Sequence, residues 1–431
     1  MDDSTHFQER WGPLRASGFR FIFVFFTLIV FPFPLNVLPG ISTLIEPYDS
    51  LWGWMIAWVG PNLLGLTEPI TQSYSGSGDK LYDWLWYFVA LGLTVIATLI
   101  WTALDWKRPN YAVLKRWFLM FLTYYLAYFM FVYGIIKLFY MQFIPLNLEQ
   151  LHESYGQSSP MRLLWTFMGS SHSYTVFAGA SETLAGVLLF IRKTRTLGGL
   201  VAAAVMLNVF MLNMSYDVPV KLFSFQLMLI GLYIASVDAP RILNFALNRP
   251  APAAEHTPLL NLQPGRRILL TLQVAFIGYV VFSQVTGARE VRKQYGPDRE
   301  KSPLYGVYNV ETFVQNGDTL APLFTDPMRW KRVLFDYIGF SSVLNMRDSL
   351  TRYATKFDTV EHTLTFSAFQ DTVNLYLFRY QRTDSTLHLA GALAGDSIRV
   401  DLHHYDLNRF GLLNRGFHWI NEVPYNRYNY E

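Results

Sequence analysis

Seven stretches of this chain approach the roughly 20 apolar residues that an α-helix needs to cross the ~30 Å hydrocarbon core of a bilayer. They cover residues 17–38, 81–104, 117–140, 174–191, 197–214, 219–237 and 267–286. Backbone polar groups find no water in hydrocarbon, so such segments must satisfy their own hydrogen bonds as helices. The sequence therefore predicts a polytopic α-helical membrane protein with about seven spans.

The first apolar stretch stands where a signal peptide would. It is long and lacks a small-x-small cleavage site, so we expect a retained span that ends near Pro32, Pro34 and Pro39. Residues 51–66 are also apolar, but Gly60-Pro61 interrupts them and they are too short to cross comfortably. Their tryptophans favour a helix that lies at the membrane interface or re-enters the membrane.

Basic residues between the spans indicate the orientation of the chain, because cytoplasmic loops carry an excess of lysine and arginine. If there are seven spans, four basic segments lie on the same side of the membrane. They contain Arg10, Arg15 and Arg20; Lys107, Arg108, Lys115 and Arg116; Arg192, Lys193 and Arg195; and Arg241, Arg249, Arg266 and Arg267. The opposite loops, 141–173 and 215–218, hold Arg162 against the acidic residues Glu149, Glu153 and Asp217. We therefore expect a cytoplasmic N-terminus, with everything after about residue 287 on the outer side.

Composition agrees with a membrane part joined to a more polar part. Hydrophobic residues make up 52% of the 431 residues and charged residues 16%, against about 25% charged in soluble proteins. The chain has no cysteine, which excludes disulfides, thiolate nucleophiles and cysteine-ligated metals. A net charge of +3 is too small to indicate a nucleic-acid partner. The bilayer is the expected partner, and a further membrane or periplasmic protein is an open alternative.

From about residue 304 the pattern changes to short strands at a spacing of ~8–12 residues. The turn signals between them are Asn316-Gly317-Asp318, Gln370-Asp371, Thr383-Asp384-Ser385 and Gly395-Asp396. This pattern predicts a C-terminal antiparallel meander, either a small barrel or a sandwich. The order of the strands loosely resembles a lipocalin-like barrel.

Two clusters of polar residues occur in this C-terminal region. His403 and His404 lie with Asp401 and Asp406, but adjacent histidines on a strand point to opposite faces, so we predict a solvated strand edge and no metal site. The terminal sequence GLLNRGFHWINEVPYNRYNYE (411–431) has two interpretations. It is a tail that packs under the barrel or against the membrane surface, or a plug that completes a site between the two domains.

Lys137 and Glu182 are the candidate functional residues of the membrane part, because an ionisable group in hydrocarbon usually faces a cavity or a partner. Glu182 lies about 8 residues, or roughly 12 Å, below the outer end of its span. Four consecutive spans place polar groups at this depth. The others are Tyr133, His172, Asn208, Asn213, Asp217 and Lys221.

We expect two ion pairs in this set, Lys137 with Glu182 and Lys221 with Asp217, because each pair neutralises charges that are costly alone. Such residues form either a water-filled ligand pocket open to the outer side or a static polar network between helices. The small residues around Glu182 allow close helix packing and do not distinguish the two alternatives. No catalytic residue is assigned beyond the candidates Lys137 and Glu182.

Two short motifs lie between Tyr133 and about Tyr233: Tyr133-Gly134-x-x-Lys137-Leu138, and Gly179-x-x-Glu182-x-x-x-Gly186 with Leu188-Leu189 and the basic loop RKTRTLGG. Over this part the chain is similar to the DoxX/DoxD-like membrane family. The resemblance implies a four-helix core whose pocket is lined by Lys137 and Glu182. The implied organisation is a cytoplasmic N-terminus (1–16), an N-terminal transmembrane region (17–130), the DoxX-like core (131–240, its first span starting at 117), a cytoplasmic linker (241–266), a last transmembrane helix (267–286) and a periplasmic β-domain with a tail (287–431).

The whole layout resembles the longer DoxX-like proteins of Bacteroidota-type bacteria, which implies a bacterial inner membrane with the β-domain in the periplasm. The Gly-x-x-Lys element also looks distantly like the vitamin K-dependent carboxylase-like (HTTM) membrane proteins, although the tandem lysine of that family is missing here. Two functions stay open. One is binding of a lipid-like or quinone-like ligand, or of an envelope partner. The other, implied by the thiosulfate:quinone oxidoreductase subunits of the DoxX family, is a quinone-linked oxidoreductase or a subunit of one.

Overall fold

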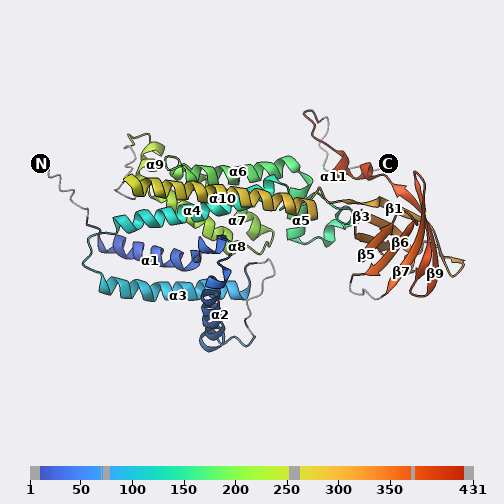
Figure 1. Ribbon diagram of the computed structural model, residues 1–431, viewed down its shortest axis with the longest axis horizontal. Coiled ribbons are helices and arrows are strands. Elements are labelled where there is room, and N and C mark those ends of the chain that lie inside the picture. Colours follow the sequence, from blue (N-terminus) through green and yellow to red (C-terminus); the bar gives the residue numbers. More distant parts are fainter. Residues whose placement is uncertain (1–9, 69, 71–77, 252–262, 370–373, 422–431) are drawn as a thin grey trace. The chain divides into compact units, whose positions relative to one another are not determined.

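The computed structural model describes residues 10–68, 70, 78–251, 263–369 and 374–421. The chain divides into two compact units, each made of separate stretches of sequence: residues 1–138 with 176–287, and residues 139–175 with 288–431. The first unit is helical, and the second contains all the described strands (Figure 1). The predicted fold class, a helical membrane part followed by an antiparallel β-domain, is confirmed.

Most long helices of the first unit coincide with the predicted apolar stretches, whereas the helix Ala239–Ala246 and the start of the helix Gln263–Tyr295 lie largely within the predicted linker at 241–266. The helices of this unit are α1 (Pro13–Val30), η1 (Leu35–Val37), α2 (Ser42–Leu64), α3 (Leu81–Leu104), α4 (Ala112–Leu138), α6 (His172–Phe190), α7 (Arg195–Ser215), α8 (Lys221–Ser236), α9 (Ala239–Ala246) and α10 (Gln263–Tyr295). Six helices among the described residues are long and apolar enough to cross a membrane. A seventh span results if α8 and α9, which meet at a bend of 78°, are counted as one.

Helix α2 differs from the other long helices of this unit. It begins at Ser42, nine residues before the predicted segment, contains Pro47 and Pro61, and ends at Gly65 in the left-handed conformation. It runs crosswise to α1 and α3 (Figure 1). Trp52 of α2 packs edge-on against Trp86 of α3. Further tryptophans of α2 stay exposed, as residues of an interfacial belt do. The interfacial placement of this helix stays a prediction.

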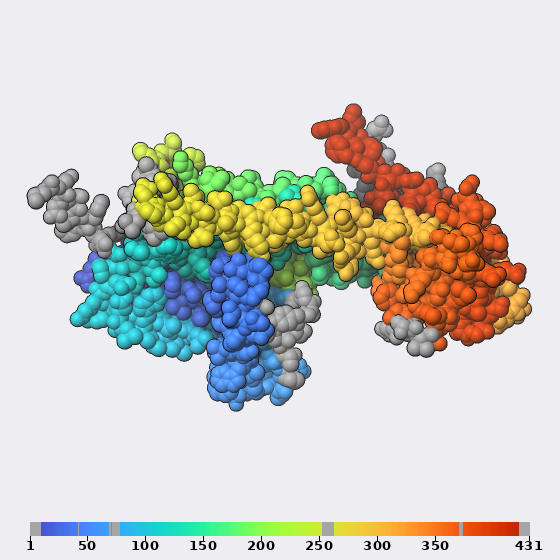
Figure 2. Space-filling model, in the orientation of Figure 1, coloured from blue at the N-terminus to red at the C-terminus, as the bar shows by residue number. Residues whose placement is uncertain are grey.

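Among the described candidate spans, α4 has the largest buried share, and Leu122, Leu126 and Met130 along it are fully enclosed. Exposed apolar side chains cover α10, among them Ile268, Leu270 and Val274. Figure 2 shows α10 in yellow on the outside of the helical unit. An apolar outer surface of this kind is what lipid chains require of a spanning helix.

The second unit contains a closed antiparallel barrel. Its strands are β1 (Lys301–Gln315), β2 (Asp318–Thr319), β3 (Trp330–Tyr337), β4 (Phe340–Asn345), β5 (Leu350–Asp358), β6 (Thr363–Ala368), β7 (Leu375–Arg382), β8 (Thr386–Leu393) and β9 (Asp396–Tyr405). The order is β2-β1-β3-β4-β5-β6-β7-β8-β9, and pairing of β1 with β9 closes eight of these strands into a ring. Of the alternatives left open by the sequence, the barrel is therefore the one observed.

Aromatic residues fill the barrel interior. Phe335, Phe366 and Phe378 are fully buried there, and Trp330 lies among them. Eight strands enclose an interior that is just wide enough for side chains to fill, so this core resembles a packed domain interior. At one edge, Gly306 adopts a φ of 145° beside a break in the β1–β3 register, and a Cβ there would lie 2.9 Å from the His404 ring. Glycine is thus required at this bulge.

Three of the four predicted turns fall between described strands. Asn316 and Gly317 have positive φ angles and join β1 to β2, which fits a two-residue hairpin. Residues 383–385 join β7 to β8, and Gly395 precedes β9. The predicted turn at Gln370-Asp371 lies outside the described residues, and so do residues 252–262 of the predicted linker at 241–266.

The segment between α4 and α6 belongs to the second unit. It contains η2 (Gln150–His152), η3 (Tyr155–Gln157) and α5 (Pro160–Ser170), and after the barrel the chain adds η4 (Leu407–Arg409) and α11 (Gly411–Asn414). Helix α5 has a proline at its first position and the Ser159 side chain as its N-cap, which accepts a hydrogen bond from the Arg162 N–H at 3.1 Å.

Candidate functional site

Lys137 and Glu182 form the predicted ion pair between α4 and α6. The ammonium donates to both carboxylate oxygens, at 2.7 and 2.8 Å, and the two residues are 5% and 1% exposed. Lys137 also donates a longer hydrogen bond, 3.4 Å, to the Tyr133 carbonyl and lies 5.5 Å from the centre of that ring. Both charges are thus paired and hydrogen-bonded, as burial of an ion pair requires.

Glycines allow the two helices to come this close. A Cβ on Gly179 of α6 would lie 2.7 Å from the Gly134 carbonyl oxygen of α4, and a Cβ on Gly134 would lie 2.9 Å from the Gly179 carbonyl oxygen. Either substitution would drive the helices apart. The two motifs around Lys137 and Glu182 therefore meet face to face.

The remaining predicted residues make separate local contacts. Lys221 pairs with Asp217 at 2.9 Å, as predicted, and Asn213 donates to the Ser224 hydroxyl at 3.0 Å. Asn208 is exposed on α7. His172 packs edge-on against Tyr140 in the second unit.

A second acidic residue at the start of α8, Asp79, was missed by sequence reasoning. Its carboxylate accepts hydrogen bonds from the backbone N–H groups of Lys221 and Leu222, at 2.6 and 2.9 Å, and lies 3.9 Å from the Lys221 ammonium. It therefore binds the first N–H groups of the helix from another segment, where a negative charge also interacts favourably with the helix dipole.

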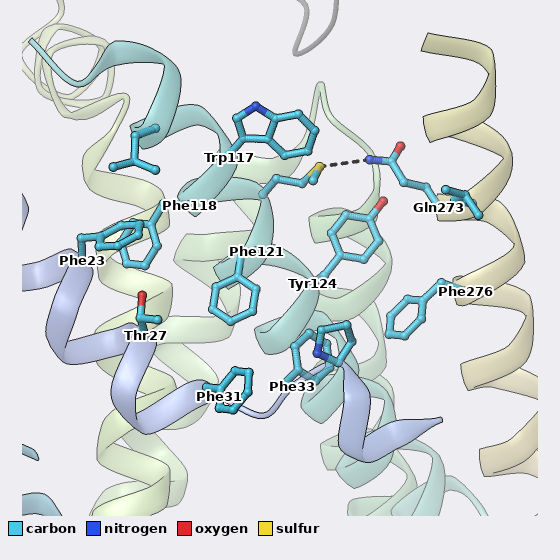
Figure 3. Close-up of a pocket in the computed structure, with 14 residues that line it drawn as sticks. Phe23, Thr27, Phe31, Phe33, Trp117, Phe118, Phe121, Tyr124, Gln273 and Phe276 are labelled. Atoms are coloured by element: carbon cyan, nitrogen blue, oxygen red, sulfur yellow. Dashed lines mark hydrogen bonds between the residues drawn. The ribbon is translucent and has the colours of Figure 1, made fainter. Parts of the chain in front are cut away.

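A pocket of about 560 Å³ lies elsewhere in the first unit, among α1, the turn that follows it, α4 and α10. Aromatic rings make up most of its wall, with Phe23 and Phe118 on one side and Phe276 on the other (Figure 3). Its lining residues are Phe23, Thr27, Phe31, Phe33, Pro34, Leu114, Trp117, Phe118, Met120, Phe121, Tyr124, Leu272, Gln273 and Phe276. None of the predicted site residues is among them.

Polar groups in this pocket are few. Gln273 of α10 donates to the sulfur of Met120 on α4 at 3.4 Å, which is the dashed contact in Figure 3, and Thr27 and Tyr124 add hydroxyl groups. Ligand pockets typically combine a mostly apolar wall with a few polar groups, in volumes of roughly 300–1,000 Å³. The pocket is thus suited to an apolar molecule.

The aromatic residues of the pocket were present in the sequence as parts of three predicted spans. The sequence could not show that they line one pocket, because phenylalanine and tryptophan are equally expected on any lipid-facing helix. Only the meeting of α1, α4 and α10 distinguishes the lining residues from their neighbours.

The second unit holds a buried polar cluster that sequence reasoning also missed. Glu149, 8% exposed, accepts hydrogen bonds from Arg352 of β5 at 2.8 and 3.1 Å and from the Ser342 hydroxyl of β4. Next to it, the Leu148 N–H donates to the carboxylate of Asp336 on β3 at 3.1 Å. The segment before α5 is therefore held on the barrel by two acidic groups.

Burial raises the pKa of the Asp336 carboxyl above its ordinary value, and the hydrogen bond from Leu148 opposes this effect only in part. Burial also lowers the pKa of His152, whose Nδ1 lies 2.8 Å from the Leu148 carbonyl oxygen. Groups with shifted pKa values therefore lie on both sides of this contact, His152 on the segment and Asp336 on β3.

In the histidine patch His403 and Asp406 are exposed, whereas Asp401 and His404 are half-buried. Asp401 pairs with His388 across β8 and β9 at 2.7 Å. Within the part of the chain described, no three His, Asp or Glu side chains are grouped as a metal site would need. In the terminal sequence, Phe417, Trp419 and Ile420 are 78%, 91% and 82% exposed. The expectation that the tail packs under the barrel is wrong for residues 416–421, because their contacts, such as Phe417 on Trp419, are local.

Fold and sequence together define a polytopic α-helical membrane protein that carries an eight-stranded antiparallel β-barrel domain. "Uncharacterized protein YwoB" of Bacillus subtilis (strain 168) is 32% identical to the chain over 126 residues, which are 29% of this chain and 80% of that protein. The chain therefore belongs to the same family as YwoB. No protein-family model matches the chain, and no solved structure matches it.

Replacing Glu182 by Gln should lower the free energy of unfolding by about 3–5 kcal/mol, because it leaves the Lys137 ammonium buried without a counter-charge. The measurement is denaturant unfolding of the purified protein in detergent. Asp217→Asn is the matched control, since it removes an acid from an exposed pair and should cost less than about 1 kcal/mol. Equal effects of the two substitutions would contradict the structural importance of the buried pair.

Asp336 should make the barrel unit less stable as pH rises. The folded-state pKa is raised, so the unfolded chain loses this proton first, and stability falls between the ordinary aspartate value and the raised one. Asp336→Asn should remove this decline in thermal unfolding followed by circular dichroism. Asp358→Asn is a control of opposite sign, because hydrogen bonds from the Glu361 and Val360 N–H groups lower the pKa of Asp358. An unchanged pH profile for Asp336→Asn would refute the assignment.

Proposed function

We propose that this protein is an integral membrane protein that binds a lipid-like or quinone-like molecule in the pocket between α1, α4 and α10. The observation that carries the proposal is the pocket itself, with about 560 Å³ of space and a wall made mostly of aromatic rings. Residues of three different helices converge on it. Its few polar groups, on Thr27, Tyr124 and Gln273, provide hydrogen-bonding positions for one polar end of a mostly apolar ligand.

In this proposal Lys137 and Glu182 set the packing of α4 against α6. Each carboxylate oxygen already accepts from the ammonium, and both side chains are enclosed. The role proposed for the pair is therefore the static alternative of the two considered from the sequence. The DoxX-like assignment remains a proposal, supported by the direct contact of the two glycine-containing motifs that carry the resemblance.

We further propose a bacterial inner membrane as the location, with the N-terminus in the cytoplasm and the barrel in the periplasm. The basic residues at the starts of α4, α7 and α10 support this orientation. A bound quinone would support the alternative function as a quinone-linked oxidoreductase subunit, whereas a co-purifying protein would support a role with an envelope partner.

Thr27→Phe should fill part of the pocket and reduce the amount of co-purified apolar ligand at least tenfold, as measured by native mass spectrometry of protein in mild detergent. Thr271→Phe is the matched control, because Thr271 is exposed on α10 and does not line the pocket. If both variants retain the same molecule in the same amount as the unchanged protein, the ligand does not occupy this pocket.

Single-cysteine labelling tests the orientation directly, since the chain has no cysteine to remove. Ser349→Cys lies in the exposed turn between β4 and β5, and Lys193→Cys lies in the exposed turn between α6 and α7. With the outer membrane made permeable, a membrane-impermeant maleimide should label position 349 while the inner membrane is intact. Position 193 should react only after the inner membrane is opened. Labelling of both positions from one side would overturn the proposed orientation.

A further inference from the structure

Gln273 places an amide group inside the last span of the helical unit. It follows Arg267 by six residues, about 9 Å along α10, and precedes Arg289 by 16 residues, with no charged residue between. The side chain is half-buried and lines the pocket. Among the described residues, the amide's only hydrogen-bond partner is the sulfur of Met120, and a thioether is a weak acceptor. An amide at this depth is thus short of partners, which costs free energy.

The Tyr124 hydroxyl lies near this amide. Tyr124 packs against Phe276 with ring centres 6.0 Å apart, one turn after the contact between Met120 and Gln273. Long side chains in a helix lean toward the preceding turn, so the hydroxyl reaches back toward Met120. Figure 3 shows it pointing toward the end of the Gln273 side chain. In the part of the chain that the structure describes, this hydroxyl makes no hydrogen bond.

The pocket wall carries no charge, because the 14 described residues that line it are all uncharged. An ionised phosphate or carboxylate taken into an apolar site without a counter-charge loses its hydration and gains no partner. The ester groups of a phospholipid lie next to its phosphate, so a phospholipid placed with an ester at Gln273 would bring its charge inside. The part of a ligand that reaches Tyr124 and Gln273 is therefore uncharged.

We infer that the pocket binds an uncharged lipid whose carbonyl oxygen accepts hydrogen bonds from the Tyr124 hydroxyl and the Gln273 amide N–H. This inference rests on the proposed function and names its ligand class. A carbonyl oxygen has two lone pairs and accepts from both donors at once, which gives each of them the partner that it lacks. The apolar remainder of the lipid packs against the aromatic wall. The ester of an acylglycerol and the ketone of a quinone both supply such an oxygen.

The test is native mass spectrometry of the full-length protein titrated with separate lipids. One is dioleoylglycerol, and the second is its diether analogue, which has chains of the same length and no carbonyl. The unchanged protein should bind the diester roughly tenfold more tightly, because only the diester accepts from both donors. It should also bind the diester more tightly than phosphatidylglycerol with the same acyl chains. A polyprenyl quinone that binds more tightly than the diester identifies a ketone as the source of the same carbonyl chemistry.

Two variants locate the contact. Tyr124→Phe and Gln273→Leu each remove one donor and keep most of the side-chain volume, so each should weaken binding of the diester about fivefold. Binding of the diether should stay unchanged in both, which also shows that the variants are folded. Tyr128→Phe is the matched control, because it removes a hydroxyl one turn further along α4, outside the residues that line the pocket. It should alter the binding of neither lipid.

The outcomes separate this inference from the proposed function. Equal affinity of the unchanged protein for diester and diether would overturn the carbonyl contact, and tighter binding of phosphatidylglycerol than of the diester would overturn the uncharged class. Both results leave the pocket standing as a lipid site. A diester preference that persists in Tyr124→Phe and Gln273→Leu, or that disappears in Tyr128→Phe, would refute the assigned donors. Binding of none of these lipids, together with no apolar ligand lost in Thr27→Phe, would overturn the proposed function as well.

Discussion

The ion pair between Lys137 and Glu182 is the constraint on which the helical unit depends. Two charges inside a membrane are tolerated only when they meet, and these two meet because glycines let α4 and α6 touch. This contact sets the distance between α4 and α6. Among the described candidate spans α4 is the most buried, and its first half forms a wall of the aromatic pocket. Helix α4 thus contributes both Lys137 of the buried ion pair and one wall of the aromatic pocket.

Polar chemistry in the two units follows one physical rule. Where a charge is buried, it has a partner: Glu149 binds Arg352, and Asp336 accepts from the Leu148 backbone. Where the acid of a pair is exposed, as Asp217 is beside Lys221, solvent screens the two charges and the pair adds little to stability. Burial therefore separates the charged groups that hold the fold from those that contribute little to it.

Much of the architecture could be predicted from the sequence. The length and apolarity of the spans placed the helices, because hydrocarbon admits few alternatives, and turn residues such as Asn316-Gly317 placed the strand boundaries. The pair Lys137–Glu182 could be predicted because an isolated charge in a membrane demands a partner. The pocket could not, since its aromatic residues look like any lipid-facing surface until three distant helices meet. The contact of Glu149 with Arg352 joins residues far apart in sequence, and nothing local marks either of them.

The division of the barrel unit into two stretches of chain has a consequence for the order of synthesis. Residues 139–175 leave the ribosome before residues 176–287, and the strands that cover Leu148 and bind Glu149 come later still. Until those strands have been synthesised, the Leu148 side chain and the Glu149 carboxylate lack the surfaces that enclose them in the folded protein. The barrel unit therefore cannot finish folding until α10 and the strands that follow it have been synthesised. A chain that stops before β5 would leave Glu149 without its arginine.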